Sequence, residues 1–373
     1  IKTIVTECVT SGHPDKMADV IADSILDYAV SHDPKTRAGI EVLIKDNKVV
    51  LGGEVTTRAQ IPYNTIVRDV VSGYNFSKEH HLTRDEIEVI NLIGLQSPEI
   101  NAGVDQSDGE IGAGDQGFVV GYASNDTRSR LPLGVAISRD ICNMITRLHK
   151  SGLKCGPDAK SQVSVSYFND KRPEIDYILV STMHDPSLSI EEVRETITKR
   201  VREELYSYYG NVENEIEDIK IVVNPCGAWN IGGPVSDCGV TGRKIVVDQF
   251  GGYANVGGGA FSGKDMTKVD RSAAYLARFI ANIIVESEMA ATAKVELSYM
   301  IGVAQPASFD ITLDESHKHL EPRLRDWFKH NMDMSPKGII QLFSVGEDFS
   351  FADLARYGHY GKSDGDSCYR IIR

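Results

Sequence analysis

The sequence predicts an α+β protein built from three similar units, each with the element order β-α-β-β-α-β. Alternating strand patterns and amphipathic helix patterns recur three times, in the same order, along 373 residues. Hydrophobic content of 41% and charged content of 25% are those of a globular chain long enough for more than one core. We therefore expect three domains related by pseudo-threefold symmetry, each with a sheet covered by helices on one face.

The first unit covers residues 1–110. We expect a strand over residues 3–9 and then a helix over 14–32, because Met17, Ile21 and Ile25 fall on one helical stripe. Residues 40–45 and 48–54 alternate around Asp46-Asn47, which predicts a hairpin. A short helix over 62–71 follows. Residues 95–114 are polar and rich in glycine, as functional loops of this length often are.

The second unit, residues 111–231, repeats this order. Strands are expected over 117–122, 162–168, 174–182 and 218–223, with helices over 132–150 and 189–205. Ser189 and Glu192 form a capping box at the start of the second helix, and Gly152 ends the first. The third unit, residues 232–373, has expected strands over 244–247, 295–303 and 308–313, and helices over 268–288 and 317–330. The uncovered sheet faces are expected to pack against each other or a second subunit.

Composition and charge exclude several classes of protein. A formal net charge of −13 repels nucleic acid and anionic membranes, so neither is an expected partner. No apolar run approaches the ~18 residues of a membrane span, and no signal-peptide pattern is present. The six cysteines include no C-x-x-C pair, which favours reduced thiols in a cytoplasmic protein over a zinc site.

The stretch GGGAFSGKD at residues 257–265 nearly matches the phosphate-loop pattern G-x-x-x-x-G-K-[ST]. Asp265 stands where a Ser or Thr should hold magnesium, and no buried strand runs into the turn, so a true P-loop is disfavoured. Lys264 and Lys268 share a helical face, with Asp270 and Arg271 beyond. The stretch therefore suits either a magnesium–polyphosphate site or a solvated helix start.

A second candidate, SGHPDK at residues 11–16, lies between the first strand and the first helix. A helix N-terminus attracts anions, and Lys16 adds positive charge. Asp15 is a candidate metal ligand, and His13 a candidate hydrogen-bond donor to an oxygen that gains charge. The alternative is plain capping, in which Ser11 or Asp15 serves the helix and His13 is incidental.

Basic residues recur at the expected ends of elements in this acidic chain. They are Lys16, Lys160, Arg243, Lys244, Lys264 and Lys268. If they converge, they form one cationic site for a polyphosphate. Asp15 and Asp270 would then supply carboxylates to magnesium, which shares its shell between a few carboxylates and substrate phosphates.

The segments SGHPDK, GGEVTT, QSPEI, GAGDQG, PDAKSQ, TGRK and GGGAFSGKD…KVDRSAAY occur in this order. Together they resemble the S-adenosylmethionine synthetase (methionine adenosyltransferase) family over essentially the whole chain. The resemblance implies that ATP, L-methionine and water give S-adenosylmethionine, phosphate and diphosphate. It also implies a homodimer with active sites shared between subunits, often paired into a homotetramer.

The resemblance also implies a role for each matching residue. His13, Lys160, Arg243 and Lys264 are the expected catalytic residues, and His13 would hydrogen-bond the departing oxygen. The expected ATP contacts are these four with Asp158, Trp229, Asp237, Lys244 and Ala260, and the expected methionine contacts are Glu54, Gln96, Asp115, Asp237 and Lys268. Asp15 and Asp270 would bind Mg²⁺, two ions per site, Glu41 would bind K⁺, and residues 96–108 would form a gate.

The sequence departs from the family pattern at a few positions. Ala228-Trp229-Asn230 replaces the usual Arg-Phe-Val, so Trp229 would either stack on adenine or fill the core or an interface. Met266 replaces a proline, and residues 102 and 107–109 make the gate atypical. The missing Arg keeps a second hypothesis open, a catalytically silent nucleotide-binding subunit. A third is an unrelated P-loop ATPase or kinase.

Overall fold

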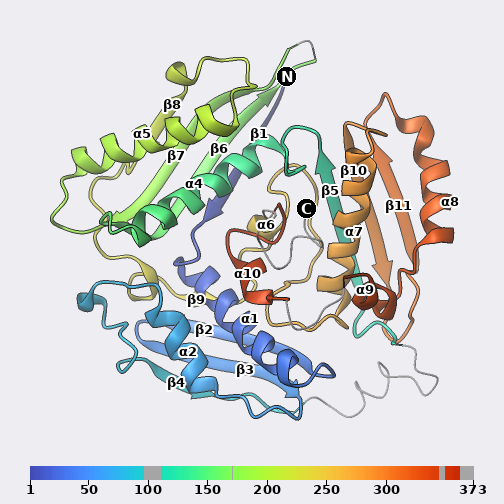
Figure 1. The fold of residues 1–373 in the computed structure, drawn as a ribbon, viewed down its shortest axis with the longest axis horizontal. Helices are drawn as coiled ribbons and strands as arrows, with labels where there is room; N and C mark the ends of the chain where they lie inside the picture. The colour runs from blue at the N-terminus through green and yellow to red at the C-terminus, as the bar shows by residue number, and fades with distance from the viewer. Residues whose placement is uncertain (96–110, 170, 344–348, 362–373) are drawn as a thin grey trace.

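The computed structural model describes residues 1–95, 111–169, 171–343 and 349–361, and its fold confirms the predicted α+β class. Three sheets with helices packed on them surround a central region that holds α6 (Ile245–Asp248) and α10 (Phe351–Ala355) (Figure 1). No helix in these described ranges is long and apolar enough to cross a membrane.

Among the described residues, two sheets have four strands in a matching order, and the third has three strands. The first runs β4 (Glu88–Asn91), β3 (Lys48–Thr56), β2 (Arg37–Lys45), β9 (Gly239–Val240). The second runs β8 (Lys220–Val223), β7 (Glu174–His184), β6 (Cys155–Tyr167), β1 (Lys2–Val9). The third runs β11 (Ser308–Leu313), β10 (Thr292–Tyr299), β5 (Gly117–Ser124).

The opening strand of each repeat pairs with a strand of another repeat. β1 pairs antiparallel with β6 and β5 with β10, and β9 returns to pair with β2. The exchange is therefore cyclic, and the sequence repeats interleave in space.

Helices cover the sheets in pairs. α1 (Pro14–His32) and α2 (Tyr63–Ser72) pack on the first sheet, α4 (Leu133–Lys150) and α5 (Ile190–Tyr208) on the second, and α7 (Val269–Glu286) and α8 (Glu321–Asn331) on the third. α9 (Pro336–Phe343) packs on α7, and α10 packs on α1. The predicted stripe of α1 is buried, since Met17, Ile21 and Ile25 are each 0% exposed.

Two local sequence signals act as predicted. Lys45 pairs with Lys48 across a two-residue turn in which Asp46 has a φ of 52°, the left-handed conformation that tight hairpin turns require. Ser189 and Glu192 make both hydrogen bonds of a capping box at the start of α5.

The strand predicted over residues 244–247 is wrong. Residues 245–248 form the short helix α6, and β9 supplies the edge strand of the first sheet instead. The run Ile245-Val246-Val247 has high strand propensity, but Val247 packs into a cluster with Cys8 and Cys142 while Val246 stays 45% exposed. These tertiary contacts override the local preference.

Candidate active site

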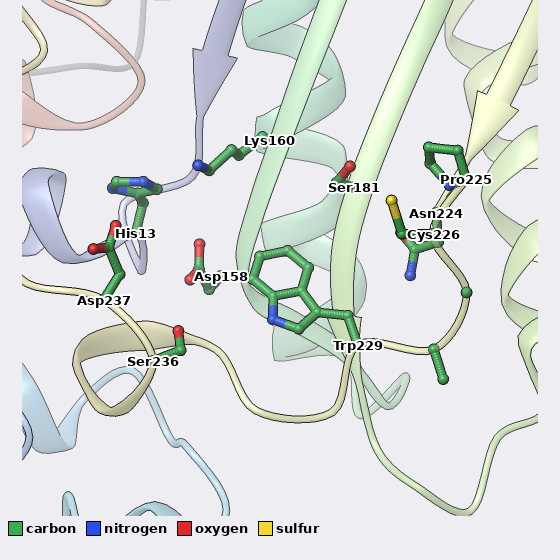
Figure 2. A pocket seen from close by; sticks show the side chains of 12 residues that line it. His13, Asp158, Lys160, Ser181, Asn224, Pro225, Cys226, Trp229, Ser236 and Asp237 are labelled. Atoms are coloured by element: carbon green, nitrogen blue, oxygen red, sulfur yellow. The ribbon is translucent and has the colours of Figure 1, made fainter.

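A cavity of about 410 Å³ lies between the start of α1, strand β6 and the segment that follows β8 (Figure 2). Five of the predicted nucleotide contacts line it: His13, Asp158, Lys160, Trp229 and Asp237. Its volume is in the range of small-molecule sites. The lining combines an indole, a lysine, an imidazole and two carboxyl groups, which suits a ligand with a flat ring and negative charge.

His13 is the N-cap of α1, and its Nδ1 accepts a hydrogen bond from the Asp15 N–H at 3.2 Å. The proposed alternative of Ser11 or Asp15 as the cap is therefore wrong. Burial and the nearby Lys244 and Lys160 charges lower the pKa of His13 to about 3. The ring is neutral near pH 7 and, with Nδ1 accepting, carries its proton on Nε2. His13 can donate a hydrogen bond without bringing a charge.

Asp158 is buried in β6 at the base of the cavity. Its Oδ2 accepts from the Gly233 N–H at 2.8 Å, while its Oδ1 is buried with no hydrogen-bond partner among the described residues. Burial raises the pKa of Asp158 to about 7. A buried oxygen without a partner beside a cavity is suited to a polar group of a ligand.

Trp229 forms one wall of the cavity (Figure 2). Its Nε1–H donates to the Ile231 carbonyl at 2.7 Å, and its backbone N–H and C=O bond to His184. The indole is therefore held in one orientation, with part of its surface toward the cavity. Nothing in the structure explains Ala228 in place of arginine.

Asp15 lies next to His13 and binds two predicted site cations. Its Oδ2 accepts from Lys244 Nζ at 2.6 Å, and its Oδ1 lies 3.5 Å from the Arg243 guanidinium. Burial raises the pKa of Asp15, but the hydrogen bonds from Lys244 and from the Val240 N–H lower it by more. The pKa of Asp15 is therefore below its ordinary value. Asp15, Arg243 and Lys244 therefore extend the polar wall beside His13.

A second set of predicted residues surrounds Lys264. Its Nζ lies 2.7 Å from Asp270 Oδ2, and its backbone bridges to Gly39 of β2. Desolvation raises the pKa of Glu41, and the charge of Lys264 partly offsets that rise. A Cβ at Gly259 would lie 2.1 Å from Asp270 Cγ, so this glycine is needed for the close approach.

The remaining predicted residues lie mostly on the Lys264 side. Glu54 pairs with Gly39 across the first hairpin, and Gly114, just before the exposed Asp115, donates to the Thr267 carbonyl. Lys268 Nζ binds Asp265 Oδ2 at 2.8 Å. Ala260 lies against Gly242. Gln96 and the predicted gate 96–108 lie outside the described residues.

Within one chain the predicted residues form two groups. The cavity group is His13, Asp15, Asp158, Lys160, Trp229, Asp237, Arg243 and Lys244; the Lys264 group is Glu41, Glu54, Asp115, Lys264, Lys268 and Asp270. β9 reaches β2 at Leu43 and Ile44, whereas Lys264 reaches it at Gly39. At ~3.4 Å per residue, about 14 Å of strand separates Gly39 from Leu43. The convergence of all the cations in one site therefore stays a prediction.

Lys16 is not part of either group. It is 0% exposed, and its Nζ lies 3.0 Å from Asp19 and also binds Asp248. It points into the core because α1 presents this side to the centre of the molecule. The expectation that Lys16 adds charge to an anion site is therefore wrong.

Asp265, the residue that breaks the phosphate-loop pattern, is a buried structural carboxylate. It accepts from the backbone N–H groups of Ala38 and Thr267 and from Lys268. Residues 249–268 contain no described strand leading into the turn. The GGGAFSGKD segment thus lacks the strand–loop–helix arrangement of a P-loop.

Asp19 and Asp23 have a role that was not predicted from the sequence. Both are buried, and each accepts a backbone N–H from a loop that carries a predicted site cation. The available signal was the spacing of four between Asp15, Asp19, Asp23 and Asp27, which places the four side chains on one face of a helix.

Comparison with known proteins gives a consistent result along the chain. Models of the S-adenosylmethionine synthetase N-terminal, central and C-terminal domains match residues 2–98, 110–229 and 231–369. An S-adenosylmethionine synthase of Sulfurovum sp. (strain NBC37-1) is 41% identical over 96% of this chain and 93% of its own length. One from Helicobacter pylori (strain J99) is 40% identical over 96% and 92%. A solved, unusual S-adenosylmethionine synthetase from Campylobacter jejuni has a TM-score of 0.85 at 34% identity, covering 98% of this chain and 96% of that one.

Proposed function

Because the chain belongs to the S-adenosylmethionine synthetase family, we propose how its residues carry out the reaction of that family. The chain is an adenosyltransferase that forms S-adenosylmethionine, phosphate and diphosphate from ATP, L-methionine and water. The match of all three domain models, in order, carries this assignment. The methionine sulfur attacks C5′ of ATP, and the C5′–O bond to the triphosphate breaks.

We propose that the cavity holds the adenosine part of ATP. Trp229 offers an indole face for adenine, in place of the phenylalanine usual in the family. The buried Oδ1 of Asp158 is available to a polar group of the nucleotide. The fixed orientation of the indole favours stacking over the alternative role as core filler.

His13 is proposed to donate from Nε2 to the oxygen that departs from C5′. The neutral ring suits this task, since a donor is needed there and sulfur has no proton to lose, so no general base is required. Lys160, Arg243 and Lys244 are proposed to balance the charge that gathers on the triphosphate. Preorganised donors of this kind are typically worth ~3 kcal/mol each in the transition state.

The two groups suggest an active site completed by a second subunit. The cavity group binds a nucleotide but lacks Lys264 and Asp270, and the Lys264 group contains the proposed methionine contacts Glu54, Asp115 and Lys268. We propose that the cavity group of one subunit meets the Lys264 group of its partner in a homodimer. Pairing of two such dimers into a tetramer is part of the same proposal.

The carboxylates present fit magnesium. In the described part of the chain no three His, Cys, Asp or Glu side chains gather to cage an ion. Magnesium usually takes one or two carboxylates and leaves its other positions to water and phosphates. Asp15 and Asp270 would hold Mg²⁺, which when bound neutralises phosphate charge, and Glu41 would give one oxygen to K⁺.

The same cationic residues are proposed to hold the triphosphate while it is hydrolysed to phosphate and diphosphate. Residues 96–108 are proposed to close over the reactants and exclude water from the first step. A cytoplasmic location is also proposed, supported by the free thiols of Cys8, Cys142, Cys155, Cys226 and Cys238.

The test is direct. Purified protein is incubated with ATP, L-methionine, Mg²⁺ and K⁺, and S-adenosylmethionine is measured. Absence of product from a folded oligomer that still binds ATP would support the silent-subunit hypothesis instead. A P-loop ATPase would hydrolyse ATP without methionine, and we expect no appreciable hydrolysis under that condition.

A further inference from the structure

Four aspartates form a stripe along α1, the helix that packs between the first sheet and the centre of the molecule (Figure 1). Each accepts a backbone N–H from a segment more than two hundred residues later in the chain. The bonds run to Asp15 from Val240 at 2.9 Å, to Asp19 from Gly242 at 2.9 Å, to Asp23 from Gly263 at 2.8 Å and to Asp27 from Phe351 at 2.6 Å. One helix therefore holds three separate segments of the chain: β9 with the turn after it, the turn at Gly263 and the start of α10.

The two middle bonds hold turns of the same kind. Gly242 and Gly263 have φ values of 77° and 83°, a conformation that favours glycine. Gly242 directly precedes Arg243 and Lys244, and Gly263 directly precedes Lys264. The path of the backbone through each glycine sets where these cations lie.

The aspartates that hold these glycines are inaccessible to a substrate. Asp19 and Asp23 are each 0% exposed. Lys16 balances the charge of Asp19 at 3.0 Å, and Arg271 binds both oxygens of Asp23 at 2.7 and 2.9 Å. Arg271 also donates to the Lys264 carbonyl at 3.2 Å. The Asp23–Arg271 pair thus binds the Gly263 N–H and the Lys264 carbonyl, which lie on either side of the peptide that joins these two residues.

We infer that Asp19 and Asp23 are positioning residues, which fix the two cation-bearing turns in the geometry that the departing triphosphate requires. Hydrogen bonds to a carboxylate are stronger than neutral ones, so replacing the charge loosens the turn. A misplacement of about 1 Å at a reacting group costs on the order of a hundredfold in rate. This inference rests on the proposed function, since the reaction gives the cations their task.

Asp27 provides a matched control on the same helix. It accepts from the Phe351 and Ala352 N–H groups and from Ser350 at the start of α10, which carries none of the proposed site cations. Asp19→Asn, Asp23→Asn and Asp27→Asn thus make the same chemical change, each at a carboxylate of α1 that accepts a backbone N–H from a distant segment. Rates are measured below the lowest melting temperature of the set.

For Asp19→Asn and Asp23→Asn we expect kcat for S-adenosylmethionine formation to fall by about tenfold or more, with KM for methionine changed by less than about threefold. The rise in melting temperature given by magnesium tripolyphosphate should shrink in both. Asp27→Asn should keep the parental kcat and the parental rise in melting temperature with magnesium tripolyphosphate, even if the variant itself is less stable. Equal losses of kcat and ligand-induced stabilisation in all three variants would overturn the inference, because they would show a general structural role.

If an Asn variant does not fold, the Glu variant at that position replaces it, because Glu keeps the charge opposite Lys16 or Arg271 but moves the carboxylate by one methylene. Asp19→Glu and Asp23→Glu should fold and show reduced kcat, and parental kcat in both would overturn the inference. The tripolyphosphate measurement separates this inference from the proposed function. A parent that makes no S-adenosylmethionine refutes the function, whereas a parental tripolyphosphate response in the Asp19 and Asp23 variants refutes positioning.

Discussion

Replacing Lys264 with methionine should reduce activity far more than stability. Lys264 Nζ lies 2.7 Å from Asp270, and the two side chains are 23% and 14% exposed. A partly exposed pair of this kind contributes about 0.2–1 kcal/mol to folding, which corresponds to a melting-temperature change of roughly 2–4 °C or less. Methionine also keeps most of the aliphatic stem.

The catalytic magnitude is larger. A preorganised donor to developing charge is worth about 3 kcal/mol, and each 1.36 kcal/mol is tenfold in rate, so kcat should fall by roughly 150-fold. The comparison of these two magnitudes decides whether Lys264 acts on the substrate or on the fold.

The assay measures kcat for S-adenosylmethionine formation together with the melting temperature of the same preparation. Lys48→Met is the control, because Lys48 forms an exposed ion pair with Glu88 at 3.3 Å on the same sheet, outside both site groups. The control should keep its rate. A large fall in the melting temperature of Lys264→Met, or a rate loss no greater than that of Lys48→Met, would refute the role given to Lys264.

Three further predictions concern the cavity. His13→Asn should reduce S-adenosylmethionine formation by about a hundredfold but reduce hydrolysis of added tripolyphosphate much less; equal losses would contradict a role in the first step. Trp229→Ala should weaken ATP binding by the ~1–3 kcal/mol typical of a stacked base, which raises KM for ATP. Trp229→Phe should keep a KM near that of the parent. A parental KM in Trp229→Ala would contradict stacking. Asp158→Asn should stabilise the unliganded protein at pH 8 by about 4 kcal/mol, because a pKa raised from 3.8 to about 7 corresponds to 1.36 kcal/mol per unit. Because burial raises the folded pKa of Asp158 to about 7 from an ordinary 3.8, the native state favours the protonated form. The stability from that protonation is complete below the unfolded pKa and is lost as pH rises through about 7, so the gain should vanish toward pH 4, as denaturant titrations at several pH values would show.

Local patterns predicted the elements well because each depends on near neighbours in sequence. The stripe of α1, the turn at Asp46 and the cap at Ser189 are examples. Strand pairing is different, since β9 is two residues long and its partner β2 lies far earlier in the chain. No local signal distinguishes Gly239-Val240 from a loop, whereas Ile245-Val246-Val247 has the composition of a strand.

The residues of the site show the same difference between local patterns, which could be predicted, and contacts between distant segments, which could not. Motifs predicted residue types, and the structure brings His13, Asp158, Lys160, Trp229 and Asp237 together around one cavity. Charge alone could not tell Lys16, which faces Asp19 and Asp248 in the core, from Lys160, which faces the cavity. That difference depends on the rotation of α1 relative to later segments.

The cyclic exchange of β1, β5 and β9 has a consequence for synthesis on the ribosome. The first sheet begins to form as β2 and β3 emerge, yet its edge stays open until residues 239–240 have been made. The second sheet, in turn, needs β1, which is made before the other strands of that sheet. The first sheet of a nascent chain therefore keeps an exposed edge, which invites wrong pairing, until residues 239–240 have been made, and β5 waits for its partner β10 until residue 292. Release of a truncated product before β9 would leave the protein open at the edge nearest Asp15, and a fragment cut at a repeat boundary would lack an edge strand.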